Sequence, residues 1–170
     1  MYMGSNTTSA DTRAVLDAVR RIVQSLRESS RWAEKALGLS GAQLFVLQTL
    51  AESPGISLND LAARTHTHQS SVSTVVARLV ASGHVVRRKS VVDGRAVTLS
   101  LSLRGRRVAD RAPHAAQERL ILGIERLSAS RRVALASALG SLADVMDATD
   151  PEPPMFFEDR GRKPRSPRHG

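Results

Sequence analysis

Residues 57–105 constrain the fold of this chain most, because they carry two helical patterns and then a hairpin pattern in a fixed order. Ser57 and Asp60 have the spacing of a helix-capping pair, which predicts a short helix over 58–64. A second helix is predicted over about 69–81, since its apolar side chains recur every three or four residues and form one stripe. Two helices joined by so short a turn are typical of a helix-turn-helix.

The residues that follow this pair predict a β-hairpin. Side chains alternate between apolar and polar over 97–102, which is the period of a strand with one buried face, and 84–89 supplies a partner strand. Asp93-Gly94 lies between them and is a signal for a tight turn. A hairpin directly after a helix-turn-helix predicts a winged helix.

Helical patterns account for most of the remaining chain. Four further helices are predicted, over about 10–37, 41–51, 103–127 and 129–148. Pro113 lies inside the third of them and should kink it or break its hydrogen-bond ladder locally. The fold class is therefore mainly α with a small β-hairpin wing, with six helices in all.

The two ends of the chain lack these patterns. Residues 1–9 are small and polar and are predicted to be a disordered tail, and residues 149–170 form a second tail rich in Pro and Arg. Met155–Phe157 is the one apolar cluster in that tail and is a candidate for docking on the body. Between the tails, residues 10–148 are expected to form one domain.

Positive charge is concentrated over the winged-helix pattern. The chain carries a formal net charge of +9, and residues 64–107 hold nine basic side chains against the single acid Asp93. A local excess of one sign over a groove-reading motif indicates a polyanionic partner. The alternative, a solvated basic face without a partner, is less consistent with this overlap.

Several functional classes are disfavoured by the sequence. The chain has no cysteine, which excludes a disulfide framework, a thiol switch and a Cys-rich zinc site. Two histidines, His66 and His68, are weak evidence for a metal site without an acidic cluster beside them. We find no nucleophile–base pair and no phosphate-binding loop that would indicate an enzyme. We also find no apolar run of membrane-spanning length and no signal-peptide pattern. We therefore expect a cytoplasmic protein that is not an enzyme and has no cofactor or metal.

The polar face of the predicted 69–81 helix has the residue types that read DNA. A helix in the major groove needs an apolar back and a front of short hydrogen-bonding side chains. Ser and Thr reach phosphates and base edges, Gln suits adenine, and Arg suits guanine or phosphate. The predicted contact residues of this helix are His68, Gln69, Ser70, Ser71, Ser73, Thr74 and Arg78.

The hairpin is predicted to make a second DNA contact. Arg95 stands beside the turn and is expected to enter an adjacent minor groove. Asp93 is expected to hold a neighbouring arginine by a bidentate ion pair and so to fix the wing. On the adjoining strand, phosphate contacts are predicted for Arg87, Arg88 and Lys89.

Taken in order, these motifs resemble the MarR family (multiple antibiotic resistance regulators) of winged helix-turn-helix transcription regulators. The resemblance covers about residues 12–148, and Asp93-Gly94-Arg95 is its most diagnostic part. The other parts are Leu39-Ser40 with Gln43, Leu61-Ala62, Val72-Ser73, Leu79, Gly83–Arg88, Leu101-Ser102 and Gly105.

The resemblance implies an architecture and a function. It implies a winged helix-turn-helix over about 40–102, with dimerisation helices at about 10–37 and 103–148 forming a homodimer. It also implies a sequence-specific regulator, usually a repressor, that binds a pseudo-palindromic double-stranded DNA operator. A small aromatic or phenolic effector would bind between the dimerisation helices and the DNA-binding lobe. By position, the implied effector contacts are Arg31, Trp32, Arg107, Arg111 and His114.

Two other functions remain open at this point. One is an architectural DNA-binding protein without operator preference, and the other is a winged-helix module used for protein contacts. Competition between promoter DNA and random duplex separates the first from a regulator, and the protein-contact module predicts no useful DNA affinity at moderate salt.

Overall fold

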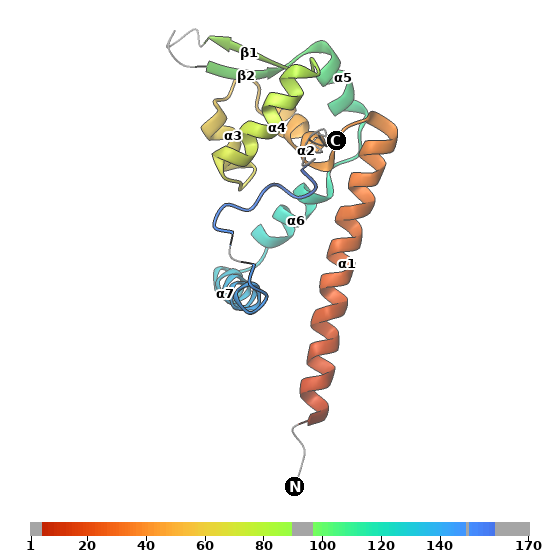
Figure 1. Cartoon of the computed structure of the whole chain (residues 1–170), viewed down its shortest axis with the longest axis vertical. Helices are drawn as coiled ribbons and strands as arrows, with labels where there is room; N and C mark the ends of the chain where they lie inside the picture. The colour runs from red at the N-terminus through yellow and green to blue at the C-terminus, as the bar shows by residue number, and fades with distance from the viewer. Residues whose placement is uncertain (1–4, 90–96, 149, 159–170) are drawn as a thin grey trace, which may run out of the picture.

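The computed structural model describes residues 5–89, 97–148 and 150–158 of the chain. Within these residues it contains seven helices and one two-stranded antiparallel sheet (Figure 1). The helices are α1 (Ser5–Leu37), α2 (Gly41–Glu52), α3 (Leu58–Arg64), α4 (Gln69–Ala81), α5 (Leu103–Arg111), α6 (Ala116–Glu125) and α7 (Ala129–Val145). The strands are β1 (Val85–Lys89) and β2 (Val97–Leu101). The predicted fold class, mainly α with a hairpin wing, is confirmed.

A compact head is built from α2, α3, α4, α5 and the hairpin. Its core consists mostly of aliphatic side chains, with Phe45 as its one buried aromatic side chain among the described residues, which suits a chain with only 3% aromatic residues. The apolar stripe predicted for the 69–81 helix forms part of this core: Val72, Val75, Val76 and Leu79 are all buried. Capping boxes at Ser40 and Ser57 begin α2 and α3, because each serine accepts the backbone N–H three residues later.

The hairpin is joined to the head by a third short pairing. β1 and β2 pair antiparallel with Arg87 opposite Leu99 and Lys89 opposite Val97. Leu99 also exchanges backbone hydrogen bonds with the segment before α3, donating to Ile56 and accepting from Gly55. These two backbone hydrogen bonds fix β2 of the wing against the segment that leads into α3.

The number of helices differs from the prediction at Pro113. The predicted helix over 103–127 is two helices, because α5 ends at Arg111 and α6 begins only at Ala116. Proline lacks the N–H that an uninterrupted helix needs and its ring clashes with the preceding turn. The prediction of six helices was therefore wrong by one, and the break anticipated at Pro113 is confirmed.

The N-terminal helix is longer than predicted and only partly covered. It begins at Ser5 rather than near residue 10, so the prediction of a disordered tail over 1–9 does not hold from Ser5 onward. Its C-terminal half packs against α2 and α6, with Leu26 and Ala33 buried. Its N-terminal half extends away from the head, as Figure 1 shows in red and orange.

The C-terminal part of the chain divides into an uncovered helix and a docked segment. No residue of α7 is buried. By contrast, Met155 is 5% exposed and belongs to the head core, so the docking predicted for the Met155–Phe157 cluster is confirmed for Met155. None of the helices in the described ranges has an apolar stretch long enough to cross a lipid bilayer.

Candidate nucleic-acid interface

α4 presents a polar face toward solvent, opposite the stripe that it buries in the core. Gln69, Ser70 and Thr74 are exposed, and Ser73 and Arg78 are partly exposed. Ser71 is different: it is buried, and its hydroxyl donates to the carbonyl oxygen of Pro153. The prediction that Ser71 lies on the open face was wrong, because the C-terminal segment covers it.

The N-terminal end of α4 is suited to anions. His68 occupies the N-cap position in an extended conformation but makes no side-chain hydrogen bond to the helix. The first backbone N–H groups of a helix have no partner within the helix, and the helix dipole places partial positive charge there. A phosphate or carboxylate oxygen at this end is therefore favoured electrostatically.

The turn after α4 is bonded to the start of α5, and this junction sets the angle between α4 and the wing. Ser102 donates its backbone N–H to the carbonyl oxygen of His84 at 2.9 Å and its hydroxyl to that of Gly83 at 2.7 Å. Gly83 has φ +72°, a left-handed conformation that favours glycine. Gly105 lies directly against the His84 carbonyl, where a Cβ would overlap with the backbone. The four residues thus join α4, β1 and α5 at one point.

His84 lies within this junction as a buried side chain, 3% exposed. Its Nδ1 lies 2.8 Å from the hydroxyl of Ser82. Burial, and secondarily the nearby Arg104 guanidinium, lower the pKa of His84 below its ordinary value of 6.5. Both effects disfavour the charged imidazolium form of His84.

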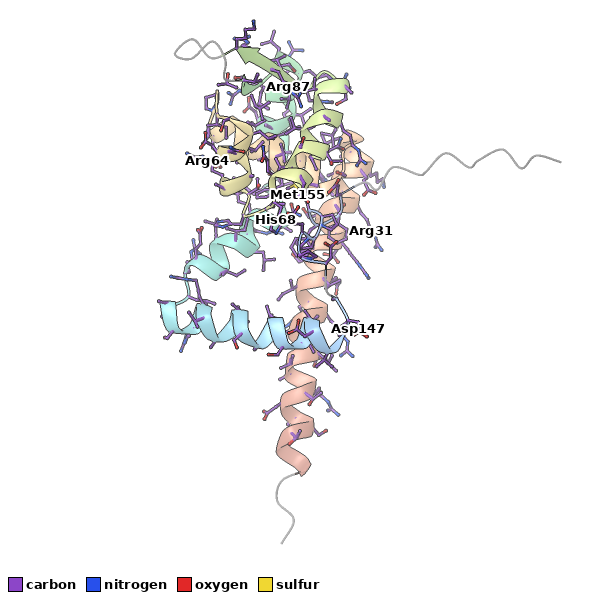
Figure 2. All side chains as sticks on the ribbon, turned by 60° about the vertical axis from the view of Figure 1, so that its left-hand side comes forward. Arg31, Arg64, His68, Arg87, Asp147 and Met155 are labelled. Atoms are coloured by element: carbon purple, nitrogen blue, oxygen red, sulfur yellow. The ribbon has the colours of Figure 1, made fainter. Side chains whose placement is uncertain are left out.

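The basic side chains of β1 lie beside α4 on one concave surface. Arg87, Arg88 and Lys89 are all exposed. Together with Ser73 of α4 and Leu58 of α3 they line a hollow of about 350 Å³. Figure 2 places Arg87 on the hairpin at the top of the head and His68 at the opposite end of α4. Ser73, on the polar face of α4, and the three basic side chains of β1 therefore border one hollow.

Two predicted wing residues, Asp93 and Arg95, lie outside the described residues. The expected ion pair of Asp93 and the expected minor-groove contact of Arg95 therefore stay predictions.

The residues implied as effector contacts come from three parts of the structure. Arg31 and Trp32 lie on α1, Arg107 and Arg111 on α5, and His114 in the linker between α5 and α6. All five are exposed, and His114 pairs with Glu118 at 2.8 Å. Arg31 is labelled in Figure 2 and extends from α1 toward solvent. They do not form one enclosed pocket in the described part of the chain.

One contact at the interface has no signal in the sequence. The carboxylate of Glu152 accepts a hydrogen bond from the Ser70 hydroxyl at 2.8 Å, across 82 residues of sequence. The acid and its neighbouring prolines gave no periodic signal, and only the apolar cluster at 155–157 indicated that this segment contacts the head.

Comparison with protein families and curated proteins gives consistent matches. A family model described as the MarR family matches residues 37–96. The HTH-type transcriptional repressor Rv2887 of Mycobacterium tuberculosis is 35% identical over 92 residues, which span 54% of this chain and 66% of the repressor. An HTH-type transcriptional regulator of Mycobacterium leprae, ML2140, is 32% identical over 141 residues, or 81% of this chain and 96% of that protein.

Solved structures agree on the fold. The transcriptional regulator SlyA aligns over 79% of this chain and 94% of its own, with a TM-score of 0.53 and 19% identity. The transcriptional regulator BldR from Sulfolobus solfataricus aligns over 86% of this chain and 99% of its own, with a TM-score of 0.51 and 21% identity. At these identities the likeness concerns the arrangement of helices and wing.

Proposed function

Because the chain belongs to the MarR family of winged helix-turn-helix regulators, we propose that it is a sequence-specific transcription regulator, acting in the cytoplasm as a repressor. The homodimer would bind a pseudo-palindromic operator with half-sites about one helical turn apart. The match to the Mycobacterium tuberculosis protein, which is named a repressor, supports repression over activation.

One observation carries this proposal: Ser73, on the polar face of α4, and the three basic side chains of β1 border the same hollow. Ser70 and Thr74 are exposed on α4 and would meet base edges or phosphates in the major groove. Arg87, Arg88 and Lys89 would meet phosphates on the flanking backbone. The junction at Ser102 and Gly105 joins α4 closely to the base of the wing, which would allow one duplex to contact both.

Two uncovered apolar faces support the homodimer. On α7 and its C-cap residue, Leu135, Leu139, Leu142 and Met146 are exposed and recur at spacings of four, three and four residues. On α1, Val15, Val19 and Ile22 repeat the same spacing and are also exposed. Such spacing places side chains along one side of a helix, and exposed stripes of this kind mark contact surfaces.

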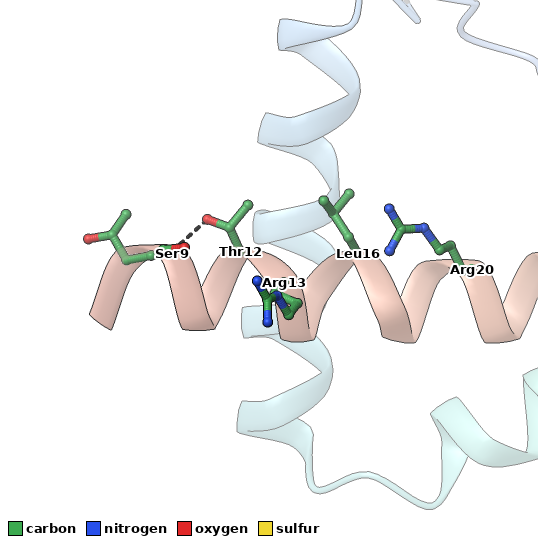
Figure 3. Close-up of a pocket in the computed structure, with 6 residues that line it drawn as sticks. Ser9, Thr12, Arg13, Leu16 and Arg20 are labelled. Carbon is green, nitrogen blue, oxygen red and sulfur yellow. Dashed lines mark hydrogen bonds between the residues drawn. The ribbon is translucent and has the colours of Figure 1, made fainter. Parts of the chain in front are cut away.

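The free end of α1 extends this surface. Figure 3 shows Leu16 beside Thr12, Arg13 and Arg20 on the exposed N-terminal half of the helix. A second copy of the chain is the occupant that the family architecture implies for both stripes.

An aromatic or phenolic acid remains the proposed effector. The bond from the Ala116 N–H to the Ser29 hydroxyl joins α1 to the start of α6. Arg31 and Trp32 follow Ser29 closely in sequence, and Arg111 and His114 precede Ala116. Cationic side chains with one indole suit a planar carboxylate. An effector bound there would favour one spacing between the head and the dimerisation helices and so shift the population that can hold both half-sites.

Competition binding at fixed salt tests the proposed function. Labelled DNA from the region upstream of the chain's own gene is challenged with unlabelled mixed-sequence duplex. A regulator should prefer its operator by at least about a thousandfold, and Arg95→Ala should weaken binding while the dimer stays intact. Equal affinity for both duplexes would favour an architectural DNA-binding protein instead, and no affinity at moderate salt would favour a protein-contact module.

A further inference from the structure

The segment 150–158 crosses the N-terminal turn of α4, the part of the head that is proposed to meet DNA. Glu152 accepts from the Ser70 hydroxyl at 2.8 Å. The next residue, Pro153, accepts from the Ser71 hydroxyl through its carbonyl oxygen at 3.4 Å, which is a weaker bond. Both serines belong to the first turn of α4, so one short segment engages two of its hydroxyls.

One buried side chain and one hydrogen bond anchor the segment beside α4. Met155 is 5% exposed and packs in the head core, and Gln117 of α6 donates to the Phe156 carbonyl oxygen at 2.9 Å. Residues 153–156 also form one wall of a cavity of about 340 Å³ whose other walls are the α3–α4 turn and α6. Figure 2 shows Met155 close to His68, next to the start of α4. The position of Glu152 is therefore set by an anchor three residues away.

The contact places a carboxylate where a DNA phosphate would be favoured. Partial positive charge at a helix N-terminus attracts either anion. A single Ser70 hydroxyl donates one hydrogen bond, so it cannot donate to Glu152 and to DNA at the same time. A carboxylate that stayed in place would also repel the phosphate backbone.

We propose that segment 150–158 is an intramolecular competitor for DNA, with Glu152 occupying the N-terminal turn of α4 until a duplex displaces it. This inference rests on the proposed function, since it assumes that α4 meets DNA. The segment should lower the affinity of the protein for every duplex, whatever its sequence. The contact that the segment blocks lies at the N-terminal end of α4, which is expected to bind phosphate.

The contact is exposed, so its influence should be moderate. Exposed charge contacts have small energies and are screened by salt. We expect Glu152→Gln, which removes the charge but keeps the shape, to bind duplex DNA about three- to tenfold more tightly than the natural chain at low salt. Met155→Ser removes the anchor and should give a gain of similar size.

Binding is measured by fluorescence anisotropy on the full chain, with a labelled duplex from upstream of its own gene and a labelled mixed-sequence duplex. Asp144→Asn is the matched control, because it removes the same charge from the exposed surface of α7. It should change affinity by less than about twofold. Circular dichroism checks that each variant is folded.

Hydrogen exchange of the natural chain provides a second readout. Amides of residues 152 and 155–158 should exchange faster when DNA is bound, because the segment is displaced. Unchanged protection with DNA bound would overturn the proposal, and so would equal affinities of Glu152→Gln and the natural chain. Equal gains from Glu152→Gln and Asp144→Asn would overturn it as well, because net charge alone would then explain them. If the natural chain bound neither duplex, the proposed function itself would fail and this inference with it.

Discussion

The side-chain amide of Gln48 donates to the carbonyl oxygen of Pro113 at 2.9 Å, although the two residues are 65 positions apart. The same amide accepts the backbone N–H of Ala115 at 2.9 Å through its oxygen. Gln48 lies in the middle of α2, so one buried side chain satisfies two of the backbone groups at the break between α5 and α6, the Pro113 carbonyl and the Ala115 N–H. The head and the helices that lead away from it are joined at this point.

Gln48→Leu should lower the free energy of unfolding by about 1–3 kcal/mol, because it leaves a buried donor and a buried acceptor without partners. Urea denaturation followed by circular dichroism measures this. Gln24→Leu, on the exposed part of α1, is the control and should stay within about 0.5 kcal/mol of the natural chain. A similar small effect at Gln48 would show that the break is not held by this side chain.

Gly105→Ala should lower the free energy of unfolding by about 1–3 kcal/mol, since its Cβ would overlap with the His84 carbonyl and force α5 away from the wing. Gly123→Ala is a matched change in α6, where a Cβ meets no atom within 4 Å. It should be neutral or stabilising by up to about 1 kcal/mol, because alanine favours a helix over glycine. Thermal and chemical denaturation compare the two. Equal effects would contradict the close approach at His84.

Arg88→Ala should weaken binding to operator and random duplex to a similar extent, because phosphate contacts carry no sequence information. The slope of log affinity against log salt concentration should fall by about one unit. A salt titration by anisotropy measures both. Lys35→Ala removes one charge from the last turn of α1 and should leave the slope unchanged. A change of sequence preference in Arg88→Ala would instead place this side chain at a base edge.

Leu139→Glu should shift the chain from dimer to monomer, because it introduces a charge in the apolar stripe of α7. Sedimentation velocity over a range of concentrations measures the change. Ser137→Glu adds the same charge on the opposite side of α7, two residues away, and should leave the dimer intact. Dissociation by both variants, or by neither, would count against this face as the contact between copies.

Acidification should destabilise the fold through His84. Because the folded-state pKa of His84 is lowered by burial and by Arg104, the unfolded chain takes up a proton first as the pH falls through 6.5. Stability from this group is therefore present above pH 6.5 and declines as the pH falls toward the folded-state pKa. Urea denaturation between about pH 8 and about pH 5 should show a steeper decline for the natural chain than for His84→Asn. Parallel curves would mean that His84 titrates alike in both states.

The sequence predicted the local elements well where a capping residue and a periodic stripe coincide. The bounds of α3 and α4 followed from Ser57, Asp60 and the valine stripe, and the strand pairing followed from alternation around a turn signal. Ser71 was misplaced because helical periodicity says only that a residue lies off the apolar stripe. It does not show which distant segment covers that face.

What the sequence by itself determined was the order of helices and strands, the break at Pro113, and the gathering of positive charge over the winged helix, since all three depend on neighbours along the chain. Only the tertiary structure decided that Ser73 and Arg87 border one hollow, that Gln48 closes the break, and that Glu152 reaches Ser70. The physical reason is that hydrogen bonds and packing between distant segments depend on how the aliphatic core positions whole elements, and no short-range pattern encodes that placement.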